Sequence, residues 1–338
     1  MEDHILKVHS TTLKHGKCKA CLMGKLRAAK YYLGGADKER LKTLNADTIV
    51  MKVKSSNGNT DAYHGVMTRS RYGVLCPNPD KSSASTAKSY LVAKHEIESI
   101  TDPGGVEGYK IQRNHTDHGT EFEGAHKVAV MNDRVIITKT LVGSHQENCF
   151  IEQENGSVET MAIAAAAVGI PDETVVGQLW DELYVHSRRA RNHISVTDDQ
   201  KKGGYTVAEE QMQLSGISDL WFDGMQGLSF GMGIYVFVRK HNRATKLAWH
   251  AIECIFVGQD VNVPGAMRAM PYKVVDGKYI LGKTLITKKF VPMQGESRYP
   301  LMRSVQHMDE FQSTKTDDKK WAKVFDSLGF EDAEWSTG

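Results

Sequence analysis

The order of the expected strands and helices constrains the fold of this chain more than any other feature of its sequence. A β-branched run at 48–53 leads into Asn57-Gly58-Asn59, a strong hairpin signal, and then into a second strand-like run at 62–67. A third strand is expected near 72–75, and a helix with serine residues at its start is expected over 82–99. The first large part of the chain therefore begins with three consecutive strands and one helix.

Strands and helices alternate after this point. The sequence predicts a strand at 109–114, a helix around 124–131, a strand at 134–141 and a helix at 152–168. A further helix is expected from residue 172 or 173 to about residue 192. The order β-β-β-α-β-α-β-α is the pattern of an RNase-H-like α/β layer with a mixed sheet, although order alone also fits other mixed folds.

Composition changes divide the rest of the chain. The first residues are basic and rich in His and Cys, whereas short strands return late in the sequence, at 234–238, 253–257, 272–275 and 283–290. We predict four parts: a basic head at 1–35, an α/β core with its C-terminal helices at 40–200, a small β-rich module at 215–295 and a polar tail at 296–338.

The composition excludes some classes of protein. A chain of 338 residues with 40% apolar residues can form two or three folded domains. Its 43 basic and 41 acidic residues give a net charge of +2, which neither requires nor excludes a nucleic-acid partner. Five scattered cysteines do not resemble a secreted disulfide framework, and we expect a reducing compartment. The longest apolar run, 161–170, is too short to span a bilayer, so no membrane role is expected.

Three acidic residues from distant parts of the sequence form a candidate metal site. Asp47 lies near the first strand, Asp117 follows the strand at 109–114, and Glu152 lies at the start of a helix, with 34 residues between the last two. Carboxylates that converge from different elements can hold two Mg²⁺ ions, which relieve their mutual repulsion. Such a pair of ions cuts and joins phosphodiesters by in-line displacement. Phosphoryl transfer on DNA is therefore the leading hypothesis.

The motifs around these acids resemble the integrase of copia-type LTR retrotransposons, part of the wider retroviral integrase family. Residues 116–122, Thr-Asp-His-Gly-Thr-Glu-Phe, are similar to the family motif Ser-Asp-Asn-Gly-x-Glu-Phe. Residues 146–155, Gln-Glu-Asn-Cys-Phe-Ile-Glu-Gln-Glu-Asn, are similar to its motif Gln-x-Asn-Gly-x-x-Glu-x-x-Asn. The resemblance touches most of residues 1–292 and is strongest around 109–171 and 230–290.

The resemblance implies that Asp47, Asp117 and Glu152 are the catalytic carboxylates and bind Mg²⁺ or Mn²⁺. Residues 155–159, Asn-Gly-Ser-Val-Glu, also resemble part of the glutamate motif, so Glu159 competes with Glu152. We prefer Glu152, because it preserves the family's interval from aspartate to glutamate to within a residue or two.

The basic head has the ligand types of a structural zinc site. Its residues His4, His9, Cys18 and Cys21 resemble the His-His-Cys-Cys knuckle of the same family. Zn²⁺ would stabilise a segment that is too small to fold alone. The interval from His9 to Cys18 is shorter than in the usual knuckle, His15 could replace either histidine, and solvent-facing side chains without metal are the alternative.

Two groups of basic residues are candidates for contacts with DNA phosphates. They are Lys25 and Arg27 in the head, and Arg188, Arg189 and Arg191 in the expected helix that ends near 192. Attraction between basic side chains and phosphates is largely independent of base sequence. A solvated surface is the alternative interpretation.

The resemblance implies a DNA integrase that trims the ends of element cDNA with water and then joins each 3′-OH to target DNA. It also implies double-stranded DNA as partner, a homo-oligomer that inserts two ends together, and action in the nucleus after assembly in the cytoplasm. Thr68, His118 and Cys149 stand where the family commonly has Asp, Asn and Gly, which would fit a decayed or host-recruited DNA-binding protein. A nuclease of the same fold is a second alternative.

Overall fold

A computed structural model describes residues 42–68, 70–101, 110–140, 149–170, 172–194, 228–238, 250–260, 263, 265–275 and 278–302. The chain divides into two compact units, each described here by itself. Unit 1 comprises the described residues within Met1–Ala164 and Leu183–Asp219, and unit 2 those within Ala165–Glu182 and Leu220–Gly338. The predicted head at 1–35 and most of the tail at 296–338 lie outside the described residues, so the four-part division stays a prediction.

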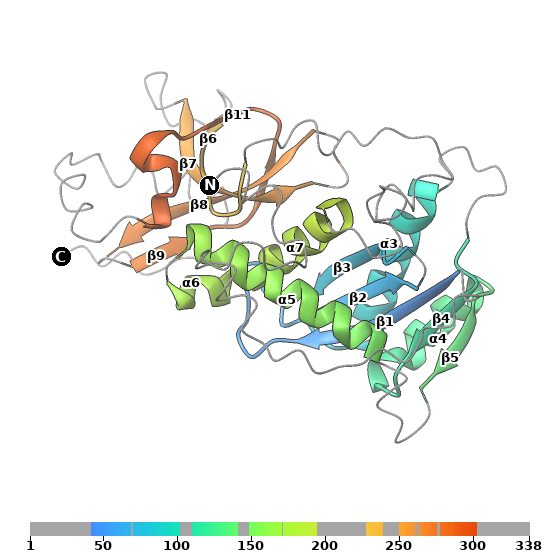
Figure 1. Cartoon of the computed structure of the whole chain (residues 1–338). Helices are drawn as coiled ribbons and strands as arrows, with labels where there is room; N and C mark the ends of the chain where they lie inside the picture. The colour runs from blue at the N-terminus through green and yellow to red at the C-terminus, as the bar shows by residue number, and fades with distance from the viewer. Residues whose placement is uncertain are drawn as a thin grey trace, which may run out of the picture. The chain divides into compact units, whose positions relative to one another are not determined.

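A five-stranded mixed sheet lies at the centre of unit 1 (Figure 1). The first three strands are antiparallel, whereas β1, β4 and β5 run parallel, and the order across the sheet is β3-β2-β1-β4-β5. The strands are β1 (Thr43–Val50), β2 (Asp61–Met67), β3 (Gly73–Asn78), β4 (Arg113–Thr116) and β5 (Ile136–Lys139). This arrangement confirms the α/β layer with a mixed sheet that the element order predicts.

The hairpin between β1 and β2 follows from its local sequence. Gly58 has a φ of 89°, a left-handed conformation that glycine adopts without steric cost. The backbone N–H of Asn59 donates to the hydroxyl of Ser55 at 3.0 Å, which closes the turn. The resulting register places Asp47 of β1 directly opposite His64 of β2.

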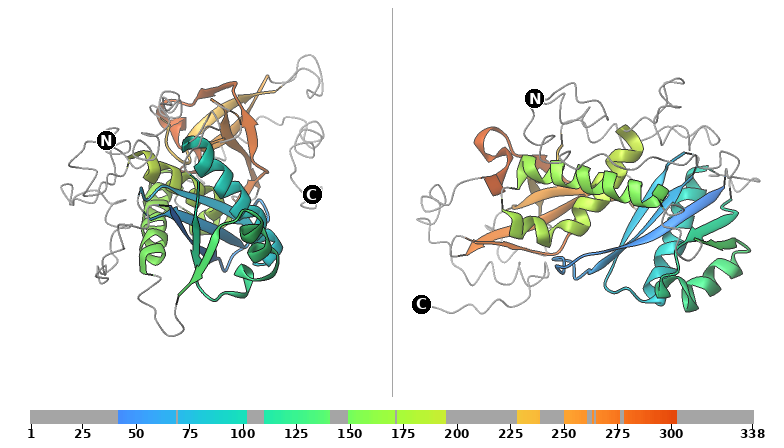
Figure 2. Two further views of the ribbon diagram at one scale, coloured as in Figure 1. Left: turned by 90° about the vertical axis from the view of Figure 1, so that its right-hand side faces the viewer. Right: turned by 60° about the horizontal axis from the view of Figure 1, so that its bottom comes forward.

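The two faces of the sheet carry different partners because side chains alternate along each strand. Leu44 and Tyr63 point into the main hydrophobic core of unit 1, which α3 and α4 cover. On the other face, Val66 packs with Ile151 of α5. Figure 2 shows α5 and the pair α3–α4 on opposite faces of the sheet. The side chains of Asp47 and His64 project from the face opposite to that of Leu44 and Tyr63. They therefore lie on the face that α5 covers.

The described helices are α3 (Ser83–Thr101), α4 (Gly124–Asn132), α5 (Cys149–Gly169), α6 (Glu173–Gln178) and α7 (Trp180–Ile194), with short 3-10 turns at η1 (Thr120–Phe122), η4 (Gly295–Arg298) and η5 (Pro300–Met302). The end of α5 at Gly169 is as predicted. The single helix expected up to residue 192 is wrong, because the chain turns at Leu179, whose N–H bonds to both Val175 and Val176 carbonyls. None of the described helices is long and apolar enough to cross a membrane.

Unit 2 contains a second sheet. Its strands are β6 (Gly233–Phe237), β7 (Ala251–Gln259), β8 (Met267–Val275), β9 (Lys278–Leu281), β10 (Leu285–Thr287) and β11 (Phe290–Pro292). They follow the order β10-β8-β7-β6-β11, and β9 pairs with β8. Ile234, Cys254 and Phe256 are fully buried in its core, which agrees with the short apolar runs in the sequence. The strand expected at 283–290 is divided into β10 and β11, and β9 was not predicted.

Candidate metal-binding site

Asp47 lies on β1, and Asp117 directly follows β4, the parallel neighbour of β1. β1 and β4 pair Thr43 with Arg113 and Asn45 with His115. The same register, extended by two residues beyond the last observed pair, would bring Asp117 level with Asp47 and on the same face, since side chains repeat every two residues along a strand. Adjacent strands lie about 4.8 Å apart, so parallel pairing brings these two carboxylates into proximity.

The chain that follows β4 holds Asp117 in a tight turn. The backbone N–H of Gly119 donates to Oδ1 of Asp117 at 2.8 Å. His118 lies at the same turn, and its Nε2 donates to the carbonyl oxygen of Thr140 at 2.7 Å. His118, which stands where the resembled family has Asn, therefore ties this turn to the residue that follows β5.

Helix α5 supplies the third acid. Nδ2 of Asn155 donates to Oδ2 of Asp47 at 2.8 Å, which turns one face of α5 toward Asp47. Glu152 precedes Asn155 by three residues and shares that face one turn earlier, where it is exposed to solvent. Glu159 lies seven residues beyond Glu152, about 10 Å further along the helix axis.

The pKa of Asp47 depends on the charges of the other two acids. Burial first, and then the charges of Asp117 and Glu152, raise its pKa to about 6, against hydrogen bonds from the Thr48 N–H and Asn155 that lower it. The structure therefore brings the three acids within electrostatic range of one another. Among the described residues, no three His, Cys, Asp or Glu side chains lie within ligand distance of a single ion.

The donor set nevertheless fits Mg²⁺. All three candidates offer carboxylate oxygens, the hard ligands that Mg²⁺ prefers, and Mg²⁺ is commonly held by one or two carboxylates together with waters and substrate phosphates. A cation would also remove the repulsion that raises the pKa of Asp47. Asp47, Asp117 and Glu152 therefore remain the candidate ligands, and their roles stay predictions.

The raised pKa of Asp47 predicts a pH-dependent response to Mg²⁺. The pKa of Asp47 in the folded protein, about 6, is higher than the ordinary value of an aspartate. The metal-free protein is therefore most stable with Asp47 protonated, and it loses this stability as the pH rises through 6. Mg²⁺ would bind the ionised form of Asp47 and restore stability at higher pH. We expect Mg²⁺ to raise the melting temperature more at about pH 7.5 than at about pH 5. Equal increases at both pH values would contradict this prediction.

Several predicted site residues lie outside the described residues. They are the zinc candidates His4, His9, Cys18 and Cys21 and the basic residues Lys25 and Arg27. The zinc site and the phosphate contacts of the head therefore stay predictions.

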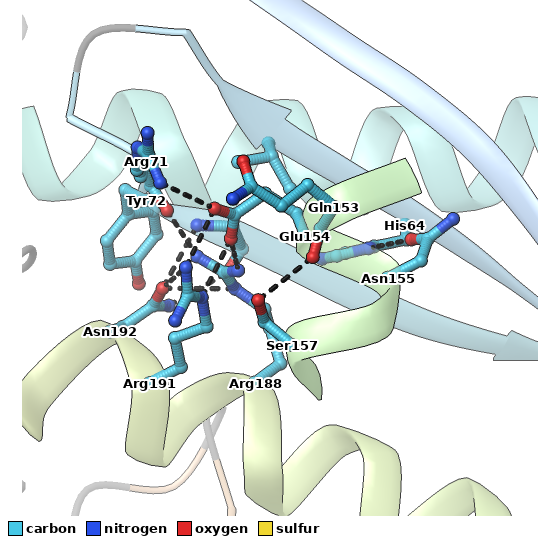
Figure 3. Close-up of polar contacts among 12 residues, drawn as sticks. His64, Arg71, Tyr72, Gln153, Glu154, Asn155, Ser157, Arg188, Arg191 and Asn192 are labelled. Carbon is cyan, nitrogen blue, oxygen red and sulfur yellow. Dashed lines mark hydrogen bonds and ion pairs between the residues drawn. The ribbon is translucent and has the colours of Figure 1, made fainter. Parts of the chain in front are cut away.

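Arg188 and Arg191 have partners inside unit 1 (Figure 3). Nη1 of Arg188 lies 2.8 Å from Oε2 of Glu154, while Nε and Nη2 of Arg191 lie 2.7 and 2.8 Å from its two carboxylate oxygens. Nη1 of Arg71 lies 3.4 Å from Oε1 of the same group. Glu154 is fully buried and Arg188 is 1% exposed. We call Glu154, Arg71, Arg188 and Arg191 the arginine–glutamate cluster.

The arginine–glutamate cluster corrects the prediction that Arg188 and Arg191 contact DNA phosphates. Burial by itself would raise the pKa of Glu154, but the guanidinium groups of Arg191, Arg188 and Arg71 outweigh it and hold that pKa below its ordinary range. A buried carboxylate needs such partners, and the two arginines of α7 supply them. Arg189 is half-buried, and its contact with phosphate stays a prediction.

His64 and Asn155 were missed as site residues. Nδ1 of His64 lies 2.6 Å from Oδ1 of Asn155, and the imidazole is fully buried. Burial first, and then the charge of Arg188, lowers the pKa of His64 to about 3, so the ring is neutral. The hairpin register was the available signal, because it places His64 opposite Asp47.

Comparisons with known proteins give structural likeness only. No protein-family model and no curated protein matches the chain. Solved structures that resemble it include the catalytic core domain of BIV integrase, with 14% identity, 51% of this chain and 95% of that chain covered, and a TM-score of 0.35.

Two further integrase structures resemble the chain. One is the HTLV-2 integrase catalytic core domain in complex with magnesium, with 13% identity, 49% and 93% coverage and a TM-score of 0.35. The other is the simian T-cell lymphotropic virus intasome in complex with PP2A regulatory subunit B56 gamma, with 14% identity, 78% and 84% coverage and a TM-score of 0.40. At these values the likeness carries no information about activity.

Proposed function

We propose that unit 1 is an RNase-H-like catalytic core and that the chain is a DNA integrase of the copia retrotransposon type. The observation that carries this proposal is the parallel pairing of β1 and β4, which brings Asp117, directly after β4, within electrostatic range of Asp47 on β1. Asn155 turns the face of α5 that bears Glu152 toward the same place. Three remote acids then share one electrostatic environment, as two-metal phosphoryl transfer requires.

The roles of the acids follow from this arrangement. Bound Mg²⁺ would activate the attacking oxygen and stabilise the leaving oxygen of the phosphodiester. Asp47 on β1 and Asp117 directly after β4 would hold the ions, and the exposed Glu152 would complete the site from α5. Asn155 keeps one oxygen of Asp47 in a fixed orientation through its 2.8 Å hydrogen bond. Fixed positions matter because positioning supplies much of the catalysis in phosphoryl transfer.

The finer parts of the proposal come from the motifs. They are end processing and strand joining of element cDNA, a homo-oligomer on double-stranded DNA, action in the nucleus, and a zinc knuckle formed by the head. Lys25, Arg27 and Arg189 are the basic residues that we propose for phosphate contact.

The test is a strand-joining assay with the full chain. Labelled duplexes that carry the element's ends are incubated with plasmid DNA and either Mg²⁺ or Ca²⁺, and covalent joining is followed on denaturing gels. We expect joined products with Mg²⁺ and few with Ca²⁺, since Mg²⁺ alone imposes octahedral geometry at short distances. Cleavage of the duplexes without any joining would instead support a nuclease of this fold.

One observation favours a second candidate function, a DNA-binding protein without catalysis. In the described part of the chain the acids do not form a closed ligand set for one ion. Thr68, which replaces a common Asp of the family motif, accepts a hydrogen bond from Asn45 at 2.7 Å and so has a structural role. Duplex binding that is unaffected by Mg²⁺, without cleavage or joining, would support this candidate.

A further inference from the structure

His64 lies in the interior of unit 1, directly beside the candidate metal site. It occupies the middle of β2, pairs with Asp47 of β1 on one side and with Leu75 of β3 on the other, and has no solvent exposure. Residues directly opposite in an antiparallel pair project from the same face of a sheet, so His64 and Asp47 both face α5. A polar ring at the centre of a sheet needs a partner, and α5 provides one.

Asn155 connects the two side chains. Its Oδ1 lies 2.6 Å from Nδ1 of His64, and its Nδ2 lies 2.8 Å from Oδ2 of Asp47 (Figure 3 shows the contact with His64). The carboxylate accepts hydrogen bonds, so the Asn155 atom that faces it must be the NH₂ group. The carbonyl oxygen of Asn155 then faces His64, and His64 must carry its proton on Nδ1. Asp47 thereby determines the orientation of the amide and the tautomer of the ring.

The other oxygen of Asp47 is also held. The backbone N–H of Thr48 donates to Oδ1 at 2.8 Å. Each oxygen of Asp47 thus accepts one hydrogen bond, one from the strand itself and one from α5. The position of Oδ2 depends on Asn155, and the position of Asn155 depends on His64. Asn155 is only partly buried, whereas His64 is fixed within the sheet. His64 can therefore serve as the rigid end of the hydrogen-bond chain that runs from His64 through Asn155 to Asp47.

The surroundings of His64 keep its imidazole in the neutral state. The charged groups that most affect the pKa of the ring are Arg188, Glu154 and Arg191 of the arginine–glutamate cluster. Two positive groups and burial exclude a positively charged imidazole, so the ring stays neutral and donates one proton. Among the residues that the structure describes, its Nε2 has no hydrogen-bond partner, which leaves the contact with Asn155 as the polar interaction that fixes the ring.

We propose that His64 is a positioning residue for Asp47, which it orients through the side-chain amide of Asn155. The inference rests on the proposed function in one respect, namely that Asp47 is a metal ligand. Groups that orient metal ligands commonly change metal affinity by about 10–100-fold when they are removed. His64 would act in this way without touching the ion or the substrate.

The test compares two variants of His64 by the affinity of the full chain for Mg²⁺, measured by calorimetry. H64L removes the donor, so Asn155 loses its anchor, and we expect Mg²⁺ affinity to fall by about tenfold. H64N presents an amide N–H near the place of Nδ1 and is expected to restore most of the affinity. H126L is the matched control, because His126 is also buried, at 1% exposure, but packs among Phe122, Tyr63 and Tyr90. It should leave Mg²⁺ affinity unchanged even if it lowers stability.

A second measurement applies even if H64L fails to fold. Nitrogen-15 NMR of the wild-type chain with labelled histidine distinguishes the two neutral tautomers, and we expect His64 to be protonated on Nδ1 at neutral pH. Protonation on Nε2 would overturn the inference.

The outcomes separate the inference from the proposed function. If D47N abolishes Mg²⁺ binding while H64L binds like the wild type, His64 has no positioning role and the proposed function stands. If D47N and the wild type bind Mg²⁺ equally, Asp47 is not a ligand, and both proposals are wrong. Loss of affinity in H64L with recovery in H64N supports the inference, whereas equal loss in both variants contradicts it.

Discussion

Replacement of Asp117 by asparagine is expected to reduce Mg²⁺-dependent DNA joining by about a thousandfold, which corresponds to about 4 kcal/mol of lost transition-state stabilisation. The change removes one charge and keeps the size of the side chain. Oδ1 of the asparagine can still accept the 2.8 Å hydrogen bond from the Gly119 N–H, so the turn after β4 should survive. The loss would then come from weaker metal binding and not from unfolding.

The matched control is D172N. Asp172 caps α6 by accepting a hydrogen bond from the Thr174 N–H at 2.8 Å, and asparagine caps helices about as well as aspartate. D172N should join DNA at the wild-type rate. Joining rates are compared from single-turnover time courses, and the melting temperature of each variant is measured beside them. Full activity in D117N would remove Asp117 from the site.

Replacement of Glu154 by glutamine is expected to destabilise the protein by about 3–5 kcal/mol, because it leaves buried guanidinium groups without their shared carboxylate. Glu154 is fully buried, and three arginines contact it at 2.7–3.4 Å. For a unit of this size such a loss lowers the melting temperature by roughly 10 °C. Thermal or urea unfolding followed by circular dichroism measures the change.

The control for this prediction is E123Q. Glu123 is 47% exposed and pairs with Lys127 and Lys139 at the surface, so its replacement should cost less than about 1 kcal/mol. The depressed pKa of Glu154 means that its contribution is fully present above the unfolded value of about 4.3 and is lost only as pH falls through a still lower folded value. The difference between E154Q and wild type should therefore be constant around neutral pH. Similar losses in E154Q and E123Q would show that burial gives Glu154 no special role.

Local sequence was sufficient to predict the order of the elements in unit 1, although β1 (Thr43–Val50) and β4 (Arg113–Thr116) are displaced from the predicted ranges 48–53 and 109–114. The turn at Gly58 determines the register of the first hairpin, and the alternation of apolar residues determines which face of each strand meets the core. The position of Asp117 after a strand was also predicted, and it directly follows β4. These features depend on neighbours within a few residues, so a sequence pattern contains them.

The environment of the arginines in α7 was not predictable in this way. A run of basic residues in a helix usually marks a solvated face, and the sequence does not show that Glu154 will be buried against it. Glu154 and Arg188 are 34 positions apart in the sequence, and only tertiary packing brings their side chains together. Nor does sequence show that Leu179 will divide one predicted helix into α6 and α7. Both errors concern contacts between elements and not the elements themselves.

The beginning of β3 has a consequence for the behaviour of the protein at high concentration. β3 is an edge strand, and at Gly73 both outward-facing backbone groups are bonded to the Asn192 amide, at 3.0 Å from the N–H and 2.7 Å from the carbonyl. Pro77, near the other end of the strand, has no N–H to offer. An edge with few available donors and acceptors is a poor template for a strand from another molecule. We therefore expect Asn192 of α7 to make this edge of the sheet less able to pair with a strand of another molecule.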